Sequence, residues 1–289
     1  MSLHPDWRAA LAALVLDGDT ARLGTRERRA SPSEPLPAAA RELLYEAFYL
    51  RPRAKPRPVS QARRSAFAQS LVAANRSPHG FEAGWTEDGV WRGLRVLRRD
   101  GLRVYASSAL VHPGGLLQVP PVQRDMLPGY LIALGSTPPR PEAAGLRLYW
   151  NLRPELAAAW MAAVTGALEA AGLPFRLKLP DDPAAYWRAD AGVIYLDARD
   201  EAPALAALKA PYSRLGGRLA RATPRFTLPL GPGLARADDP PGPDSFGEGR
   251  CRLAAEACLN RPRLRDREAA LLAQLQALGM DPMQPWKQP

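Results

Sequence analysis

A strict alternation of apolar and polar residues over residues 146–152 is the feature that most constrains the fold. The apolar positions of this segment are Leu146, Leu148, Trp150 and Leu152. A period of two predicts a strand with one buried face, and the other face then carries Arg147, Tyr149 and Asn151. The chain therefore contains at least one sheet, and one face of that sheet must be covered by other elements.

A helix and a second strand are predicted directly after this strand. Pro154 stands at the favoured first helical position, and Gly172 suits the C-terminal cap. The apolar residues between them recur every four positions: Leu156, Trp160, Val164 and Leu168. The next strand, 175–179, buries its odd-numbered residues and turns Arg176 and Lys178 to the opposite face. If the two strands share a sheet, a parallel, right-handed connection is expected.

The rest of the chain adds helices and further strands. Helices are expected over 6–17, 37–50, 61–74 and 264–278, and strands over 130–134 and 192–197. Segments 90–97 and 102–106 flank Arg99-Asp100-Gly101, which predicts a hairpin. Loops are expected over 18–36, 113–128 and 221–250. The class is α+β: an N-terminal helical subdomain (1–75) packed on a mixed β-sheet with flanking helices (76–289), or both as one continuous domain.

The positive charge of the chain comes almost entirely from arginine. The net charge is +10, and only four lysines occur: Lys55, Lys178, Lys209 and Lys287. The planar fork of arginine binds phosphate and carboxylate bidentately, so anionic partners are favoured. A nucleic-acid-binding module is a rival interpretation, but the sequence has no recognition-helix pattern, zinc spacing or aromatic RNA-binding signature.

Cysteine use and hydropathy predict a cytoplasmic protein. Cys251 and Cys258 are seven residues apart on one predicted helix, which disfavours a disulfide between them. No apolar run reaches transmembrane length, and the first residues lack a secretory pattern, so no membrane partner is expected.

Several classes of enzyme lack their motifs here. There is no Walker A loop, no dinucleotide fingerprint and no nucleophile elbow. His4, His79 and His112 are too scattered for a metal site, and each is more often a packing or surface residue. His112 lies beside a Gly-Pro loop and is the best candidate of the three. No metal and no cofactor are expected.

Polar side chains on strands and at one helix start are the remaining candidates. Lys178 is either a solvent-facing lysine on an open sheet or a general base whose pKa is lowered by burial among arginines. Arg188 and Asp190 form either a surface ion pair or part of a site. Ser245 is either a simple N-cap or, with Arg250, part of an anion site at a helix N-terminus.

A series of short segments, kept in order over most of the chain, resembles the HopA-type family of type III secreted effectors and its relatives in bacterial peptide-modification clusters. The segments are Leu43-Leu44-Tyr45 with Phe48-Tyr49, Ala74-Asn75 with Gly84-Trp85, Arg147-Leu148-Tyr149-Trp150-Asn151, Pro174-Phe175-Arg176-Leu177-Lys178, Tyr186-Trp187-Arg188-Ala189-Asp190-Ala191 with Tyr195, Pro224-Arg225-Phe226-Thr227, Ser245-Phe246-Gly247-Glu248-Gly249-Arg250 and Gly279-Met280-Asp281.

The resemblance implies an α+β fold and, for some relatives, an activity. Relatives encoded beside a kinase-like partner, in lanthipeptide and thioamide-peptide pathways, remove phosphate from phospho-Ser or phospho-Thr by β-elimination and leave a dehydroamino acid. Other relatives are effectors perceived by plant hosts. The implied function is therefore a cofactor-free phosphoserine or phosphothreonine lyase acting on a peptide, and the alternative is a non-catalytic phosphopeptide-binding or effector-like protein.

This chemistry assigns roles to the candidate residues. Lys178 would be the base that removes the α-proton, and Tyr149, Tyr186 or Asp190 would supply a proton or orient Lys178. The expected phosphate-binding set is Arg147, Asn151, Arg188, Arg225, Ser245 and Arg250, with Arg225 the weakest member. No histidine lies in a matching segment, so the residue that would act as the general acid stays open.

Overall fold

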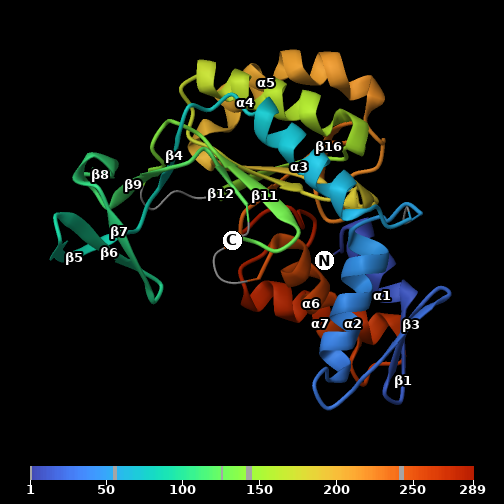
Figure 1. The fold of residues 1–289 in the computed structure, drawn as a ribbon. Coiled ribbons are helices and arrows are strands. Elements are labelled where there is room, and N and C mark those ends of the chain that lie inside the picture. The colour runs from blue at the N-terminus through green and yellow to red at the C-terminus, as the bar shows by residue number, and fades with distance from the viewer. Residues whose placement is uncertain (1, 55–56, 125, 141–144, 241–243) are drawn as a thin grey trace.

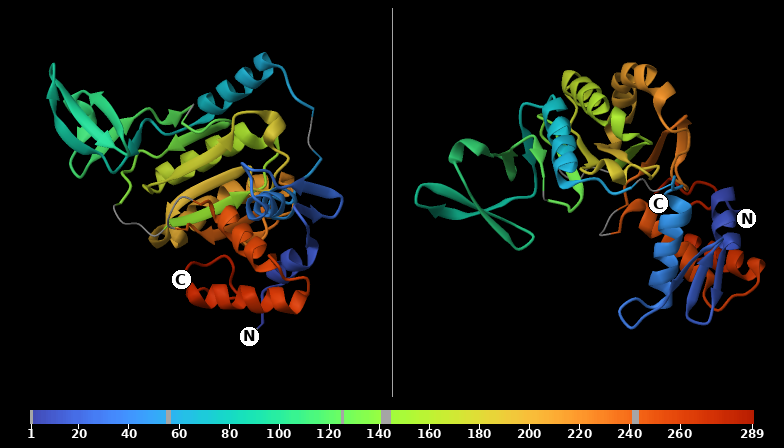
Figure 2. Two further views of the ribbon diagram at one scale, coloured as in Figure 1. Left: turned by 90° about the horizontal axis from the view of Figure 1, so that it is seen from below. Right: turned by 45° about the vertical axis from the view of Figure 1, so that its right-hand side comes forward.

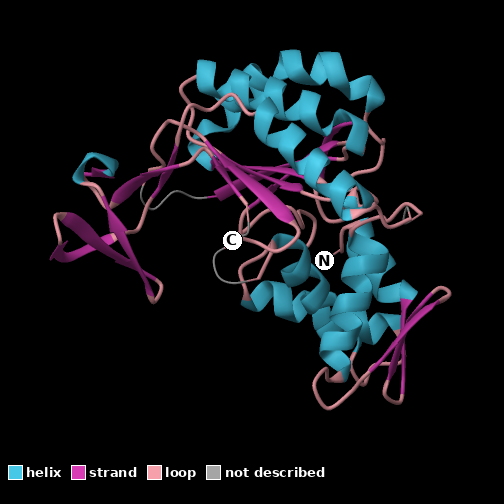
Figure 3. Cartoon of the chain, in the orientation of Figure 1, coloured by secondary structure: helices cyan, strands magenta, loops and turns pink. Residues whose placement is uncertain are grey.

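A seven-stranded antiparallel sheet lies at the centre of the protein, with helices on both faces and three small sheets outside it (Figure 1, Figure 3). The computed structural model describes residues 2–54, 57–124, 126–140, 145–240 and 244–289. The α+β class is thereby confirmed.

The strand order of the central sheet is β10-β11-β13-β14-β12-β16-β15. Its strands are β10 (Val122–Gln123), β11 (Tyr130–Leu134), β12 (Gly145–Trp150), β13 (Arg176–Pro180), β14 (Gly192–Asp197), β15 (Leu228–Gly231) and β16 (Leu234–Asp238). Each neighbouring pair is antiparallel. The strands β12 and β13 run in the same direction, as expected, but β14 lies between them and pairs with both.

Three helices cover one face of the sheet: α3 (Gln61–Ala74), α4 (Ala157–Ala170) and α5 (Glu201–Leu215). The core beneath them holds the alternating residues of β12 together with Trp160 and Val164 of α4, all fully buried. Truncation of one such tryptophan to alanine costs about 3–5 kcal/mol, so this layer contributes strongly to stability. The C-terminal cap of α4 follows as predicted, with Gly172 at φ +62°.

The opposite face of the sheet is covered over part of its area by helices from the two ends of the chain. These are α1 (Pro5–Ala13), α2 (Leu36–Leu44), α6 (Phe246–Cys258) and α7 (Leu264–Ala277). Their core includes Tyr149, Val193 and Ala237 of the sheet. Cys251 and Cys258 lie on one helix and are unpaired, as the spacing predicts.

Two small sheets form a projection, here called the wing, at one side of the molecule (Figure 2). One is β4-β9-β8, with β4 (Gly80–Glu82), β8 (Val111–His112) and β9 (Leu116–Val119). The other is β5-β6-β7, with β5 (Thr86–Trp91), β6 (Leu94–Arg99) and β7 (Leu102–Ala106). The predicted hairpin is confirmed: Asp100 and Gly101 turn it with φ of 49° and 79°. Segment 90–97 is not one strand, because a second turn at Arg92-Gly93 divides it.

Some predicted loops and helix limits are wrong. Segment 18–36 contains β2 (Thr20–Leu23) and β3 (Arg26–Arg29), and the predicted helix 6–17 ends early because β1 (Leu14–Asp17) pairs with β2. Segment 113–128 contains β9 and β10, and 221–250 contains β15 and β16. Short strands with a turn glycine carry too little periodicity to separate them from loops, and only pairing with the sheet defines them.

Candidate functional site

The face of the sheet opposite α4 brings together polar side chains from three adjacent strands. Arg176 of β13 pairs with Tyr195 of β14, and Arg147 of β12 pairs with the same Tyr195 from the other side. Lys178 lies two positions along β13 and therefore projects from this same face. The register thus places Arg147, Tyr149, Arg176 and Lys178 on one side of the sheet.

The C-terminal helices divide this face into a covered half and an open half. Tyr149 lies in the covered half and is only 2% exposed, within the core shared with α6. The open half is the floor of a pocket of about 690 Å³, to which Arg176, Lys178, Tyr195 and Asp197 contribute. The wing closes another side of the pocket through Phe81, Glu82 and Arg99.

The surroundings of Lys178 lower the pKa of its amine and so raise the neutral fraction at pH 7. Its amine lies 4.2 Å from the centroid of the Tyr130 ring and forms no hydrogen bond or ion pair within the described ranges. Burial, helped by the positive charges of Arg188, Arg147 and Arg176, lowers the pKa of Lys178 to about 8, although Asp190 acts in the opposite direction. At pH 7 roughly a tenth of such an amine is neutral, far more than for an ordinary lysine.

A buried ion pair lies next to Lys178. Arg188 donates two hydrogen bonds to the carboxylate of Asp190, and it also donates to the hydroxyls of Tyr130 at 2.8 Å and Tyr45 at 2.9 Å. Burial alone would raise the pKa of Asp190, but the charge and hydrogen bonds of Arg188 outweigh it and hold the pKa below its usual range. Asp190 is therefore a carboxylate that is hydrogen-bonded to Arg188, and its charge also interacts with that of Lys178.

Two of the four cations that line the pocket have no carboxylate partner among the described residues. Arg99 is paired with Glu82 at 2.7 Å, and Arg140 with Asp200 at 2.6 Å. Arg176 and Lys178 are the other two. The guanidinium of Arg176 lies 4.5 Å above the Tyr195 ring, and the side chain is exposed, which leaves its donors toward solvent. The two side chains leave one strand about 7 Å apart, a spacing that one phosphate group can bridge.

Besides Arg188, three further arginines were predicted to bind phosphate, and all three are held by internal partners. Arg147 pairs with Asp239, and Arg225 pairs with Asp6 at 2.9 Å. Arg250 is buried and donates to the carbonyl oxygens of Pro285 and Lys287, which fastens the C-terminal segment to α6. These contacts leave them fewer free donors than Arg176 has.

The remaining predicted residues lie outside the pocket. The hydroxyl of Tyr186 donates to the carbonyl of Pro180, and its ring belongs to the core beneath α4. The amide of Asn151 donates to the carbonyl of Ala222 at 2.7 Å. Ser245 caps α6 in a reciprocal capping box with Glu248, and an N-cap is one of the two roles expected for it. His112 hydrogen-bonds Gln118 and contacts the Phe81 ring edge-on.

Two residues of this site, Arg176 and Tyr130, are not among those predicted from the sequence. Arg176 shares the strand face of Lys178, and this parity was a sufficient signal to nominate it. Tyr130 begins β11, whose register places it across from Pro180 and beside Lys178. Nothing in the periodicity of 130–134 indicates that neighbour.

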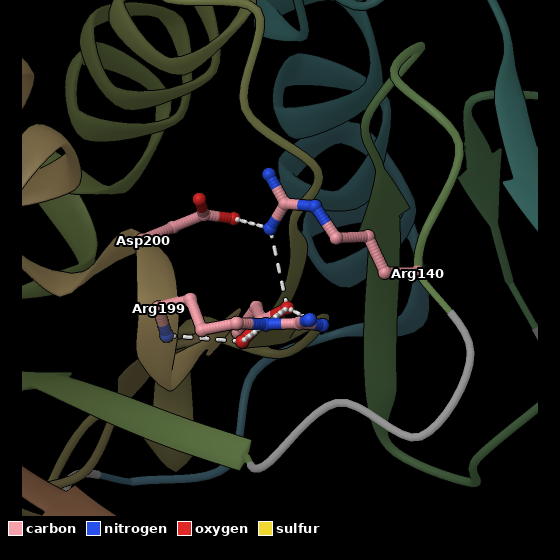
Figure 4. Close-up of polar contacts among 4 residues, drawn as sticks. Arg140, Arg199 and Asp200 are labelled. Atoms are coloured by element: carbon pink, nitrogen blue, oxygen red, sulfur yellow. Dashed lines mark hydrogen bonds and ion pairs between the residues drawn. The ribbon is translucent and has the colours of Figure 1, made fainter.

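An ion-pair cluster (Figure 4) contributes Arg140 and Asp197 to the lining of the pocket. The guanidinium of Arg140 bridges the carboxylates of Asp197 and Asp200, and Arg199 donates further hydrogen bonds to Asp197 from its backbone N–H and its guanidinium. Hydrogen bonds from Arg199, more than the opposing effect of burial, lower the pKa of Asp197 to about 2. The cluster joins the segment before β12 to the end of β14.

Metal-binding clusters and membrane-spanning helices are both absent from the described residues. In the part of the chain that the structure describes, no group of three or more His, Cys, Asp or Glu side chains is placed to hold a metal ion. Likewise, none of the described helices has the length and hydrophobicity that a bilayer-spanning segment requires.

Comparisons with known proteins agree with the fold. The model of the HopA1 effector protein family matches residues 122–287. An effector protein structure from Pseudomonas syringae pv. tomato strain DC3000 is 17% identical, with a TM-score of 0.57 over 97% of this chain and 94% of that one. An effector from Pseudomonas syringae pv. syringae strain 61 is 19% identical, with a TM-score of 0.52 over 85% and 87%. No curated protein matches the chain significantly.

Proposed function

Because this chain belongs to the HopA1 effector protein family, we propose that its pocket binds a phosphorylated Ser or Thr of a peptide and removes the phosphate by β-elimination. The observation that carries this proposal is the amine of Lys178. It is partly buried, has a lowered pKa, lacks an ion-pair partner in the described segments and lies beside Arg176 on the pocket floor.

The elimination uses the neutral amine of Lys178 as the base. The amine takes the α-proton of the phosphorylated residue, and the electrons of that C–H bond form the Cα=Cβ double bond. The Cβ–O bond then breaks, and phosphate leaves with its electron pair. Phospho-Ser becomes dehydroalanine and phospho-Thr becomes dehydrobutyrine. The ammonium of Lys178 returns its proton to the released phosphate or to solvent, which completes the cycle without an added reactant.

Arg176 is the proposed phosphate ligand. Its donors are free of carboxylates within the described ranges, and a guanidinium pairs with phosphate through two parallel hydrogen bonds. After proton transfer the ammonium of Lys178 adds a second positive charge where negative charge gathers on the leaving group. The positive charge next to the phosphate is therefore greatest after Lys178 has taken the α-proton, when the phosphate departs.

Asp190, Arg188 and Tyr130 are proposed to position the base. Asp190 and Arg188 hold each other bidentately, and Arg188 holds the hydroxyl of the ring over which the Lys178 amine lies. Side chains locked in this way keep a reacting group within the narrow range of geometry that catalysis needs. Arg147, which pairs with Asp239 and lies on the same face of the sheet, adds positive charge that lowers the pKa of Lys178.

The proposed reaction consumes a phosphorylated peptide, so a kinase must supply it. A kinase-like partner protein that phosphorylates the same peptide fits this requirement. Its binding would keep the phosphorylated intermediate close to the pocket.

Mass spectrometry of a degenerate phosphothreonine peptide library tests the proposal. Incubation with the protein should produce peptides that have lost the mass of phosphoric acid. Lys178→Ala should slow this loss by about 10²–10⁴-fold without changing the melting temperature by more than a few degrees. Lys178→Arg keeps the positive charge but cannot accept a proton, so it should be as inactive as Lys178→Ala.

Two results would contradict the mechanism or favour the alternative. If Lys178→Ala eliminates phosphate as fast as the unaltered protein, Lys178 is not the base. If phosphopeptides bind to the pocket and are recovered intact, the protein is a phosphopeptide-binding protein, and Arg176 and Lys178 serve recognition alone.

A further inference from the structure

We propose that the pocket selects phosphopeptides that carry a large apolar side chain two positions from the phosphorylated residue. This inference rests on the proposed phosphopeptide site and names the sequence class that the site accepts. It is carried by the apolar wall that adjoins Arg176 and Lys178, the two pocket cations that have no carboxylate partner among the described residues.

Each of these two cations has an apolar cross-strand neighbour that also lines the pocket. Lys178 pairs with Ile132, and Arg176 pairs with Leu134. Directly paired side chains on antiparallel strands lie about 5 Å apart at their β-carbons. The apolar wall therefore begins next to the cations, within reach of the same bound peptide.

The wall continues away from the sheet through Phe81, Met126 and Leu127. Met126 is 57% exposed and Leu127 is 39% exposed, so both side chains offer apolar surface that a ligand can cover. The Phe81 ring is held by two edge-on contacts, with His79 and with His112, each with centroids 5.2 Å apart. Part of the wall is thus formed before any ligand binds.

The geometry of an extended peptide sets the spacing of the two recognised side chains. A space of about 690 Å³ has room for a short segment of such a peptide. In an extended peptide, neighbouring side chains point to opposite sides and alternate ones to the same side, about 7 Å apart. A phosphate over Arg176 and Lys178 therefore places the side chain two residues away against the apolar wall.

Charge and hydrophobicity together identify this occupant. A fully apolar ligand would bring no counter-charge to Arg176 and Lys178, which have no carboxylate partner in the described segments, and a fully anionic ligand would leave the apolar wall exposed. A peptide with one phosphate and one large apolar side chain, such as Leu, Met or Phe, satisfies both halves of the pocket.

The test uses a library of nonapeptides with phosphothreonine at the centre and degenerate positions around it. Retention on the immobilised protein is measured at pH 6, and elimination is measured at pH 8, each by tandem mass spectrometry. We expect Leu, Met and Phe to be enriched about tenfold over Asp two residues before or after the phosphothreonine. Met126→Asp should abolish that enrichment. Met283→Asp, which alters a methionine 44% exposed on the C-terminal segment, should leave it unchanged.

The outcomes separate this inference from the proposed lyase activity. Retention with the apolar preference but without elimination supports the inference and overturns the lyase activity. Elimination without any apolar preference, or with a preference that Met126→Asp does not change, overturns the inference and leaves the lyase activity standing. If no phosphopeptide is retained or altered, both are overturned.

Discussion

The amine of Lys178 lies 4.2 Å from the centroid of the Tyr130 ring, and the hydroxyl of the same ring accepts a hydrogen bond from Arg188 at 2.8 Å. Tyr130 therefore connects the candidate base with the Arg188–Asp190 ion pair. The contact with the ring favours the ammonium form of Lys178, whereas burial favours the neutral amine. Burial prevails, since the pKa of Lys178 is lowered to about 8.

The first prediction concerns the pH dependence of elimination. Only the neutral amine can accept the α-proton, so the rate should rise with pH and level off above about 8. The midpoint of this rise reports the pKa of the Lys178 amine. Tyr130→Leu removes the contact that favours the ammonium, so it should lower the midpoint by about 0.5–1 pH unit. Tyr130→Phe keeps the ring and loses only the hydroxyl, so its midpoint should stay near that of the unaltered protein. A midpoint that Tyr130→Leu does not move would show that the ring has no effect on the base.

The second prediction concerns anion binding by the native protein. Sulfate or phosphate at about ten times its Kd should raise the melting temperature by roughly 2–4 °C relative to chloride at equal ionic strength. Arg176→Ala should remove this rise, because Arg176 supplies a pocket-floor guanidinium that has no carboxylate partner among the residues that the structure describes. Arg63→Ala, an exposed arginine on α3, is the matched control and should retain the rise. A melting temperature that responds to sulfate equally in both variants would place the anion elsewhere.

The third prediction concerns the ion-pair cluster around Asp197. The folded-state pKa of Asp197 is about 2, below its ordinary value of 3.8. A depressed carboxyl pKa means that the stabilising contribution is present above the unfolded value and is lost as the pH falls through the folded value. Asp197→Asn should lower the melting temperature at pH 7 by about 2–4 °C, a modest effect because Arg140 and Arg199 are partly exposed.

The same cluster gives a pH control for that prediction. The difference between Asp197→Asn and the unaltered protein should shrink between about pH 4 and pH 2, where the native carboxylate becomes protonated. It should also shrink at high salt, which screens exposed partners. A difference that stays constant down to pH 2 would mean that the substitution acts through packing and not through charge.

The periodicity of the sequence was enough to predict which face of each long element is buried. The alternation from Leu146 to Leu152 and the four-residue spacing from Leu156 to Leu168 are both confirmed in the core beneath α4. The same parity by itself places Arg176 and Lys178 together on the other face. These features depend only on residues two to four apart, because the geometry of a strand or helix repeats over that distance.

Tertiary structure alone decided which of the many arginines have free donors. In the sequence Arg147, Arg188, Arg225 and Arg250 are equivalent to Arg176 as phosphate ligands. In the fold, Arg147 pairs with Asp239 and Arg188 pairs with Asp190. Arg225 pairs with Asp6, and Arg250 donates hydrogen bonds to backbone carbonyls. These partners lie far away along the chain in every case but Asp190, and no local pattern specifies them. Likewise, Tyr130 reaches Lys178 only because β11 pairs with β13. Strand order and register follow from which surfaces bury together across the whole chain, and hydrophobic periodicity within one segment carries no information about its partner.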